Sequence, residues 1–183
     1  MNPANRVRII GGSHRSRVLK FPTIPGLRPS PDRVRETLFN WLGQDLTGLT
    51  CCDLFAGSGA LGFEAISRGA KKVVMLESDV RAFKALRQNA ALLDCEAFVE
   101  LLHRDALEFL REASPVFDVV FIDPPFDSGL LERIATALPR LVKRDGMAYI
   151  ESPRGVVLDP PWQMHRQGTA GHVTYQLYRH GQE

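Results

Sequence analysis

The chain has 183 residues, 44% of them hydrophobic and 24% charged, with a formal net charge of +2. This composition is typical of a globular domain that buries its own core without disulfides or structural metals. It contains no apolar run near the roughly 20 residues of a membrane span and no signal peptide, so we expect a cytoplasmic location without membrane attachment. The cysteines, Cys51, Cys52 and Cys95, are expected to be free and buried.

The N-terminal part of the chain is basic. Residues 1–40 contain eight Lys or Arg against two Asp or Glu, a net charge of +6, whereas the remainder contains 15 against 19, a net charge of −4. Two strand-like runs, 6–10 and 17–21, flank turn residues and predict a β-hairpin. A basic hairpin favours a polyanionic partner, although a solvated surface without a partner explains the charge equally well. The predicted RNA-binding residues are Arg6, Arg8, Arg15, Arg17 and Lys20.

A linker rich in Pro and Gly follows at residues 22–29, and Ser30 or Asp32 can cap a helix with apolar residues at helical spacing. From residue 50 onward, strand-like and helical segments alternate, which predicts an open, mostly parallel α/β sheet with helices on both faces. The expected strands are 50–54, 72–76, 98–102, 118–123 and 148–151, and the expected helices are 60–68, 79–92, 106–112 and 129–138. A second hairpin, 162–167 with 173–179, is expected to close the sheet with antiparallel pairing.

The segment Asp53–Gly62 carries three glycines between an expected strand and an expected helix. Such a loop lets a nucleotide-type ligand approach the helix N-terminus closely. Glu77 lies twenty residues beyond Gly57, at the end of the next strand, where a carboxylate can bind ribose hydroxyls. This spacing fits a nicotinamide dinucleotide and S-adenosylmethionine alike. Asp53 favours S-adenosylmethionine, because its carboxylate would repel a pyrophosphate but attract ammonium and sulfonium groups.

Asp105 follows the third strand of this series. Its carboxylate can accept a hydrogen bond from the adenine amine of the cofactor, while the Ala106 backbone meets the edge of the ring. The simpler interpretation is that Asp105 caps the helix that begins at Ala106. Its position alone does not separate the two roles.

The segment Asp123-Pro-Pro-Phe126 ends an apolar strand at the edge where open α/β sheets bind ligands. An exocyclic base amine is a poor nucleophile, since its lone pair is delocalised into the ring. The Asp123 carboxylate and the Pro124 carbonyl can accept both amine hydrogens and aim the nitrogen lone pair at an activated methyl group. Pro125 stiffens the turn, and Phe126 can stack on the base. The alternative is a rigid turn with a core aromatic residue.

With these motifs in this order, the chain resembles the RsmD family of bacterial 16S rRNA guanine-N2 methyltransferases. The resemblance runs from residues 8–12 through 27–40 and 53–62 to 123–126 and 175–178. It implies an α/β class I S-adenosylmethionine-dependent methyltransferase fold, which is a Rossmann-like, seven-stranded sheet with the last strand antiparallel and a small N-terminal β-hairpin. We divide the chain accordingly into a hairpin arm, residues 1–25, and a catalytic domain, residues 26–183.

The resemblance also implies S-adenosyl-L-methionine as the cofactor and a guanine of 16S rRNA, position 966, as the substrate, within assembled or assembling small ribosomal subunits. A monomer is expected. The glycine loop would line the methionine end of the cofactor, Glu77 its ribose and Asp105 its adenine. The implied cofactor-binding residues are Asp53, Ala56, Gly57, Ser58, Gly59, Glu77, Asp105, Ala106, Arg28, Pro29 and Ser30, and the implied catalytic residues are Asp123, Pro124, Pro125 and Phe126. Ser30 stands where many family members have threonine, which keeps a hydroxyl.

Three other functions fit parts of the sequence. An adenine-N6 methyltransferase fits residues 123–126, because this motif serves both amines, but the chain has no separate target-recognition domain for DNA. An NAD-dependent oxidoreductase fits the glycines and Glu77 but lacks evident hydride-transfer residues. A non-catalytic RNA-binding factor predicts a damaged catalytic motif, whereas this motif is intact. The five histidines show no metal-ligand spacing, so no metal ion is expected.

Overall fold

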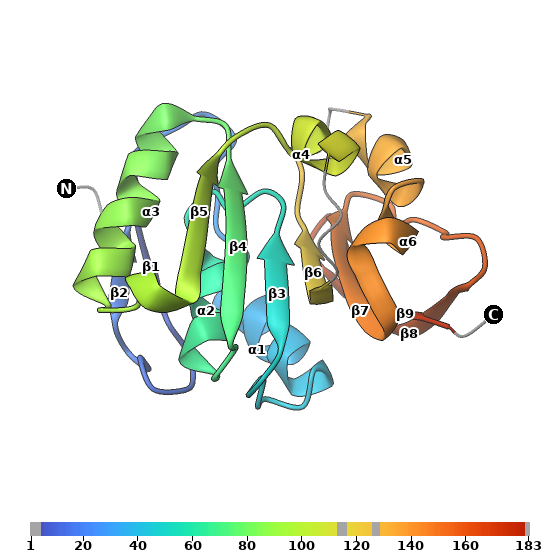
Figure 1. Cartoon of the computed structure of the whole chain (residues 1–183), viewed down its shortest axis with the longest axis horizontal. Helices are drawn as coiled ribbons and strands as arrows, with labels where there is room; N and C mark the ends of the chain where they lie inside the picture. Colours follow the sequence, from blue (N-terminus) through green and yellow to red (C-terminus); the bar gives the residue numbers. More distant parts are fainter. Residues whose placement is uncertain (1–4, 113–116, 126–128, 182–183) are drawn as a thin grey trace.

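The structure is a computed structural model that describes residues 5–112, 117–125 and 129–181. Within these residues a seven-stranded mixed sheet has the strand order β5-β4-β3-β6-β7-β9-β8, and a separate two-stranded sheet pairs β1 with β2 (Figure 1). The strands are β1 (Arg6–Arg8), β2 (Val18–Lys20), β3 (Thr50–Asp53), β4 (Lys72–Glu77), β5 (Val99–His103), β6 (Phe117–Ile122), β7 (Val142–Ser152), β8 (Trp162–Ala170) and β9 (Val173–His180). The helices are α1 (Asp32–Trp41), α2 (Ala60–Ser67), α3 (Val80–Leu92), α4 (Ala106–Glu112), α5 (Leu130–Ala135) and α6 (Leu138–Leu141), with a 3-10 turn (Glu96–Phe98) before β5.

The parallel part of the sheet consists of β5, β4, β3, β6 and β7. In its centre, Cys52 of β3 lies opposite Val74 of β4 on one side and Val120 of β6 on the other. Parallel strands that are covered on both faces are apolar over most of their length, and β4 and β6 follow this pattern. At the far end, β9 pairs antiparallel with both β7 and β8. The predicted α/β fold with antiparallel closing strands is confirmed.

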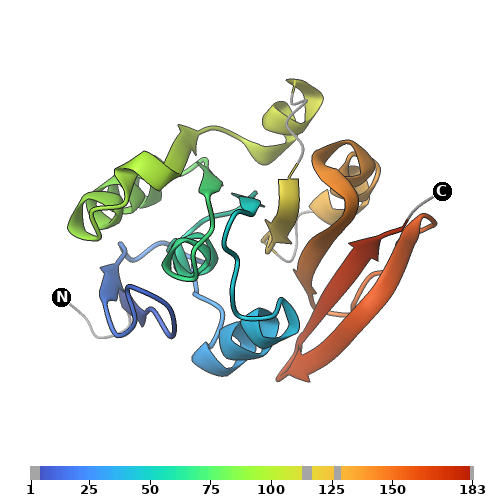
Figure 2. The same ribbon diagram turned by 60° about the horizontal axis from the view of Figure 1, so that its bottom comes forward.

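Helices cover both faces of the sheet, and each face has its own core (Figure 2). The hairpin, α1, α2 and α3 bury apolar side chains on one face, among them Phe39 and Phe63. The helices α4, α5 and α6 cover the other face, where Phe109 and Ile134 are buried. Free and buried, as expected, are Cys51, Cys52 and Cys95. No helix in the described ranges is long and apolar enough to cross a bilayer.

The helix expected over residues 129–138 is two short helices, α5 and α6. Pro139 is the second residue of α6. A proline inside one continuous helix would remove a backbone hydrogen bond and clash with the preceding turn, whereas it is tolerated at a helix start. The chain therefore ends α5 at Ala135 and starts a new helix at Leu138.

The N-terminal hairpin alternates between buried and exposed side chains. Val7 and Leu19 pair across the hairpin and enter the core that α1 and α2 share. Arg6 pairs with Lys20, and both side chains are exposed, so two positive charges lie directly opposite each other on the outer face. Like charges in this position destabilise a strand pair. An anionic partner would relieve the repulsion.

Candidate active site

The carboxyl ends of β3, β4 and β6 open into a cavity of about 640 Å³. In an open α/β sheet this edge binds ligands at the point where the strand order reverses, which here lies between β3 and β6. The predicted site residues that line the cavity are Arg28, Pro29, Ser30, Asp53, Ala56, Gly57, Ser58, Glu77, Asp105, Ala106, Asp123, Pro124 and Pro125. Gly59 does not line it, and Phe126 lies outside the described residues.

The three glycines of the loop have two separate roles. Gly57 and Gly59 have φ values of +53° and +80°, a left-handed conformation that glycine adopts without strain. Gly59 is the N-cap of α2, and a Cβ there would lie 2.5 Å from the Phe63 ring. A Cβ on Gly62, within α2, would collide with Met75 of β4. Gly57 therefore shapes the cavity wall, while Gly59 and Gly62 let α2 pack closely against its neighbours.

Glu77 connects the glycine loop to the start of α3. One carboxylate oxygen accepts a hydrogen bond from the Gly57 amide at 2.9 Å, and the other accepts one from the Asp79 amide at 2.7 Å. These contacts hold the Glu77 side chain in the cavity wall. Each oxygen keeps a second lone pair, so Glu77 can still accept hydrogen bonds from a pair of ligand hydroxyls.

Asp53 ends β3 in the wall of the cavity and is only 1% exposed. Burial raises the pKa of its carboxyl to about 7, against the effect of hydrogen bonds from the Phe55 and Gly62 amides. The nearby carboxyls of Glu77 and Glu151 raise this pKa further. A positively charged ligand group beside Asp53 would favour its ionised form. The local electrostatics therefore favour a cationic ligand group at this end of the cavity.

Asp105 caps a helix and also faces the cavity. Its Oδ1 accepts hydrogen bonds from the amides of Leu107 at 2.8 Å and Glu108 at 3.2 Å, which satisfies the first turn of α4. Asp105 and Ala106 both line the cavity. The second carboxylate oxygen can therefore serve a ligand while the first caps the helix. The adenine-binding role stays a prediction.

The end of β6 brings Asp123, Pro124 and Pro125 to the same cavity as Asp53. Burial of the Asp123 carboxyl raises its pKa well above the usual value, and the nearby carboxyls of Glu151 and Asp53 act in the same direction. Neither proline has a backbone N–H, so Pro124 contributes a carbonyl acceptor and neither proline contributes a competing donor. The arrangement suits a ligand group that donates two hydrogen bonds.

Glu151 of β7 is a site residue that the sequence analysis did not single out, and Tyr149 of the same strand supports it from outside the cavity lining. Glu151 is 4% exposed and lines the cavity together with Asp123. Its Oε1 accepts hydrogen bonds from the Ser30 hydroxyl at 2.5 Å and from the Tyr149 hydroxyl at 2.8 Å. Burial raises the pKa of Glu151 in spite of these two donors. The sequence carried a usable signal, because Glu151, like Asp53, is an acid at the end of an apolar strand.

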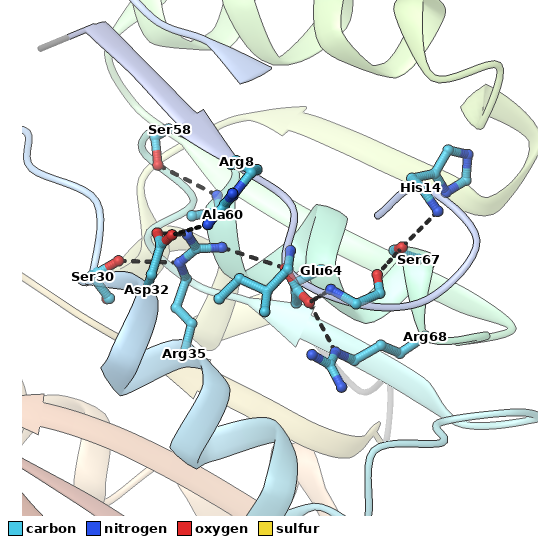
Figure 3. A network of polar contacts seen from close by, with 12 residues as sticks. Arg8, His14, Ser30, Asp32, Arg35, Ser58, Ala60, Glu64, Ser67 and Arg68 are labelled. Carbon is cyan, nitrogen blue, oxygen red and sulfur yellow. Dashed lines mark hydrogen bonds and ion pairs between the residues drawn. The ribbon is translucent and has the colours of Figure 1, made fainter. Parts of the chain in front are cut away.

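A group of charged side chains beneath the cavity holds Ser30 in place. Arg35 on α1 is fully buried and forms ion pairs with Asp32 at 2.6 Å and with Glu64 on α2 at 3.3 Å (Figure 3). The Arg35 Nε also donates a hydrogen bond to the Ser30 carbonyl oxygen at 3.1 Å. The ion pairs of Arg35 therefore set the position of Ser30 in the cavity wall.

Glu64 also holds the N-terminal hairpin. Its carboxylate oxygens accept hydrogen bonds from the amides of Ile10 and Gly11, both at 2.8 Å, and from the Arg68 guanidinium at 2.9 Å. Figure 3 shows the guanidinium groups of Arg35 and Arg68 both reaching Glu64, with dashed lines for their ion pairs. The hairpin is thus attached to the helix that begins at the glycine loop.

The five predicted RNA-binding residues are exposed on the hairpin and lie outside the cavity lining. Arg8 forms an ion pair with Asp32 at 3.2 Å, and Arg17 donates a hydrogen bond to the Leu92 carbonyl oxygen at 2.9 Å. The fold therefore gathers the described catalytic candidates, Asp123, Pro124 and Pro125, and nearly all the predicted cofactor residues in one cavity, with the basic residues on a separate surface. The RNA-binding role stays a prediction.

Comparison with known proteins places this architecture in a family. The family described as "Conserved hypothetical protein 95" matches residues 7–179. Ribosomal RNA small subunit methyltransferase D of Escherichia coli K12 is 41% identical over 181 residues, which cover 96% of this chain and 91% of that protein. Its namesake in Haemophilus influenzae is 42% identical over 185 residues, with coverages of 97% and 96%. The chain belongs to the RsmD family.

Structural similarity to solved proteins agrees with the RsmD assignment. A structure described as a methyltransferase, yhhF from Escherichia coli, superposes with a TM-score of 0.87 at 39% identity and covers 97% of this chain and 99% of that chain. Dinucleotide-binding sheets have the order 3-2-1-4-5-6, whereas in this RsmD-family chain β9 inserts antiparallel between β7 and β8. The chain is a methyltransferase, and the strand order argues against the NAD-dependent alternative.

Proposed function

We propose that this methyltransferase transfers a methyl group from S-adenosylmethionine to the exocyclic N2 amine of a guanine in small-subunit ribosomal RNA. One observation carries the proposal. Asp123 and Pro124, which can hold an amine, open into the same cavity as Asp53, Gly57 and Glu77. Relatives at 41% and 42% identity, named as ribosomal RNA small subunit methyltransferases, support the choice of substrate.

The chemistry of the cavity wall fits S-adenosylmethionine. Asp53 suits its ammonium and sulfonium charges, Glu77 its ribose hydroxyls and Asp105 its adenine amine. A volume of about 640 Å³ falls within the range of roughly 300 to 1,000 Å³ that is usual for small-molecule sites. When bound, this cofactor supplies a methyl group that the positive charge on sulfur makes electrophilic.

The contribution of the chain to catalysis is the placement of the amine. The Asp123 carboxyl and the Pro124 carbonyl oxygen accept the two amine hydrogens and turn the nitrogen lone pair toward the side of the cavity that Asp53 lines. Holding both reactants in this orientation lowers the barrier without a covalent enzyme intermediate. Apolar side chains in the lining, including Leu61 and Leu76, exclude water from the reacting atoms. The base has to leave its helix or loop to enter.

We assign RNA binding to the outer face of the hairpin, where Arg6, Arg15 and Lys20 are exposed. One hairpin cannot read a long sequence, so the shape of the RNA within assembled or assembling small subunits would select the site. The enzyme would act as a monomer in the cytoplasm, and guanine 966 is the target that the family resemblance implies.

The test is to incubate the protein with radiolabelled S-adenosylmethionine and three substrates, then to identify the labelled nucleoside. The substrates are small subunits from a strain that lacks the enzyme, naked 16S rRNA and duplex DNA. The expected product is N2-methylguanosine from the subunits, and it should be absent with the Asp123→Ala variant. Recovery of N6-methyladenine would overturn the choice of base, and no label with any substrate would overturn the proposed activity.

A further inference from the structure

Three carboxyl groups stand at the carboxyl ends of adjacent strands. Asp53 ends β3, Asp123 follows β6, and Glu151 lies near the end of β7. The register pairs Ile122 with Ile150, which places Asp123 and Glu151 side by side. All three line the same cavity. Neighbouring carboxyl groups in a poorly solvated wall do not all ionise together, so protons are shared among them.

Ser30 connects two of these acids. Its side chain is buried, its hydroxyl donates to Glu151 Oε1 at 2.5 Å, and the same hydroxyl hydrogen bonds with the Asp123 carboxyl. A hydroxyl has one hydrogen, so Ser30 cannot donate to both acids at once, and while it donates to Glu151 its oxygen can only accept from Asp123. With a proton on Asp123, the continuous arrangement is Asp123 donating to Ser30, which in turn donates to an ionised Glu151.

Two further contacts favour this distribution of protons. The Tyr149 hydroxyl is a second donor to Glu151 Oε1, and two donors on one oxygen stabilise the carboxylate. Asp123 lies beside both other acids, and these neighbours act with burial to raise its pKa well above the usual value. The relay requires the proton of the pair on Asp123, which these two contacts favour.

We propose that Glu151 is the terminal proton acceptor of the methyl-transfer reaction and is reached from Asp123 through the hydroxyl of Ser30. This role rests on the proposed function, because an exocyclic amine that gains a methyl group has to lose a proton. Water can accept such a proton where the cavity is open to solvent. Once the base and the cofactor fill the cavity, the relay to Glu151 provides a path that does not require water.

The step balances in atoms and charge. The amine nitrogen uses its lone pair to form the N–C bond, while the S–C bond breaks and sulfur keeps the bonding pair. An N–H proton then passes to the unprotonated oxygen of Asp123, the Asp123 O–H proton passes to the Ser30 oxygen, and the Ser30 hydrogen passes to Glu151. Asp123 and Ser30 end with the same number of hydrogens as at the start, and Glu151 becomes neutral.

Other groups around the relay set its pH range. Asp53 faces Asp123 from β3. Tyr149 of β7 hydrogen bonds with Glu151, and Tyr175 of β9 helps to raise the pKa of Tyr149. The Arg35 Nε on α1 donates a hydrogen bond to the Ser30 carbonyl oxygen at 3.1 Å, so a positive charge lies beside the Ser30 backbone (Figure 3). Because burial raises the pKa of Glu151, this acid accepts and holds a proton more readily than an exposed glutamate does.

The test compares Glu151→Gln with Ser30→Ala, Ser30→Thr and the matched surface variant Glu36→Gln, whose residue is exposed on α1 and lies outside the cavity lining. Single-turnover methyl transfer is measured from pH 5.5 to 9, cofactor affinity is measured by calorimetry, and folding is checked by thermal melting. Glu151→Gln should slow transfer about 100-fold, the lower end of general-base effects, with cofactor affinity changed less than about twofold. The parent rate should rise with pH as Glu151 ionises, and the Glu151→Gln variant should lose this rise.

The serine variants separate relay from packing. Ser30→Ala should lose at least about 10-fold in rate, and Ser30→Thr should recover most of that loss, since it restores a hydroxyl. Parent-like rates and pH profiles in Glu151→Gln and Ser30→Ala would overturn the relay, as would a threonine variant no faster than the alanine variant. If Glu151→Gln does not fold, the two serine variants still decide the question.

A readout without turnover keeps this inference distinct from the proposed function. Carboxyl carbon NMR of the ligand-free protein should show Glu151 titrating at a different pH in Ser30→Ala than in the parent, and unchanged in Glu36→Gln. If Glu151 titrates at the same pH in Ser30→Ala as in the parent, the relay is overturned, even when the enzyme is active. A parent protein that methylates no substrate would overturn the proposed function, whatever the NMR titration shows.

Discussion

The cavity and the N-terminal hairpin both concentrate charge, but in opposite surroundings. Asp53 and Glu151 are 1% and 4% exposed, and burial raises the pKa of both. Arg6, Arg15 and Lys20 are exposed to solvent. Buried acids exchange protons with groups within hydrogen-bond distance. Exposed bases attract a polyanion over a longer range, and salt screens this attraction. Changes in the cavity should therefore alter rate and pH dependence, and changes in the hairpin should alter affinity and salt dependence.

The largest effect is expected at Asp123, which we propose contacts the amine and not the cofactor. Asp123→Ala should lower the rate of methyl transfer at least about 1,000-fold, because the amine loses one of its two acceptors and its proton path. Cofactor affinity, measured by calorimetry, should stay nearly intact. Turnover equal to that of the parent enzyme would rule out the mechanism.

Glu64 joins the two regions, so its loss should affect folding. Glu64→Gln leaves the buried guanidinium of Arg35 without its full partner, and we expect the free energy of unfolding to fall by about 3 to 5 kcal/mol. Arg8→Ala breaks only an exposed pair with Asp32 and should cost less than about 1 kcal/mol. Urea unfolding measures both variants. Equal losses of unfolding free energy in the two variants would show that burial does not determine how much the Arg35–Glu64 ion pair contributes to stability.

Cofactor binding should depend on pH through Asp53, whose pKa is about 7 in the free protein. Below that pH the carboxyl is neutral, and a cationic ligand must first displace its proton. The dissociation constant of S-adenosylmethionine should therefore rise up to about tenfold per pH unit below 7 and level off above it. Calorimetry across pH 5 to 8 provides the measurement. Asp53→Asn should bind more weakly and with little pH dependence, and a sloped profile in that variant would assign the titration to another group.

The smallest effect is expected on the hairpin. Reversing Arg15 and Arg17 to Glu should weaken RNA binding and lower the slope of log affinity against log salt by about one for each phosphate that the hairpin no longer neutralises. Lys72→Glu is the control, because Lys72 lies at the amino end of β4, away from the cavity. Filter binding at several salt concentrations measures the slope. An unchanged slope would show that these arginines do not contact phosphate.

Local sequence was enough to predict much of this protein. The run Asp53–Gly62 and the segment that starts at Asp123 each combine a strand end with residues whose chemistry can be inferred without their neighbours in space. Alternating strand and helix patterns likewise predicted the parallel sheet, because the periods of the two structures differ. Pro139 was a local signal as well, since it accounts for the break between α5 and α6.

Contacts between residues far apart in the sequence could not be predicted from local patterns. Ser30 and Glu151 are 121 positions apart in the chain and meet through one hydrogen bond. Arg35 looked like one more basic residue of an amphipathic helix, yet it is fully buried because Glu64 on another helix supplies the opposite charge. Glu151 was visible as an acid at a strand end but carried no motif around it.

The sequence by itself determined the fold class, the glycine loop and the turn at Asp123 that we propose binds the amine, because each depends on residues that are close along the chain. Only the tertiary structure decided which acids share a cavity and which bases are neutralised. Burial and partner distance control protonation and charge, and both depend on how strands β3, β6 and β7 lie side by side and on how α1 packs against α2.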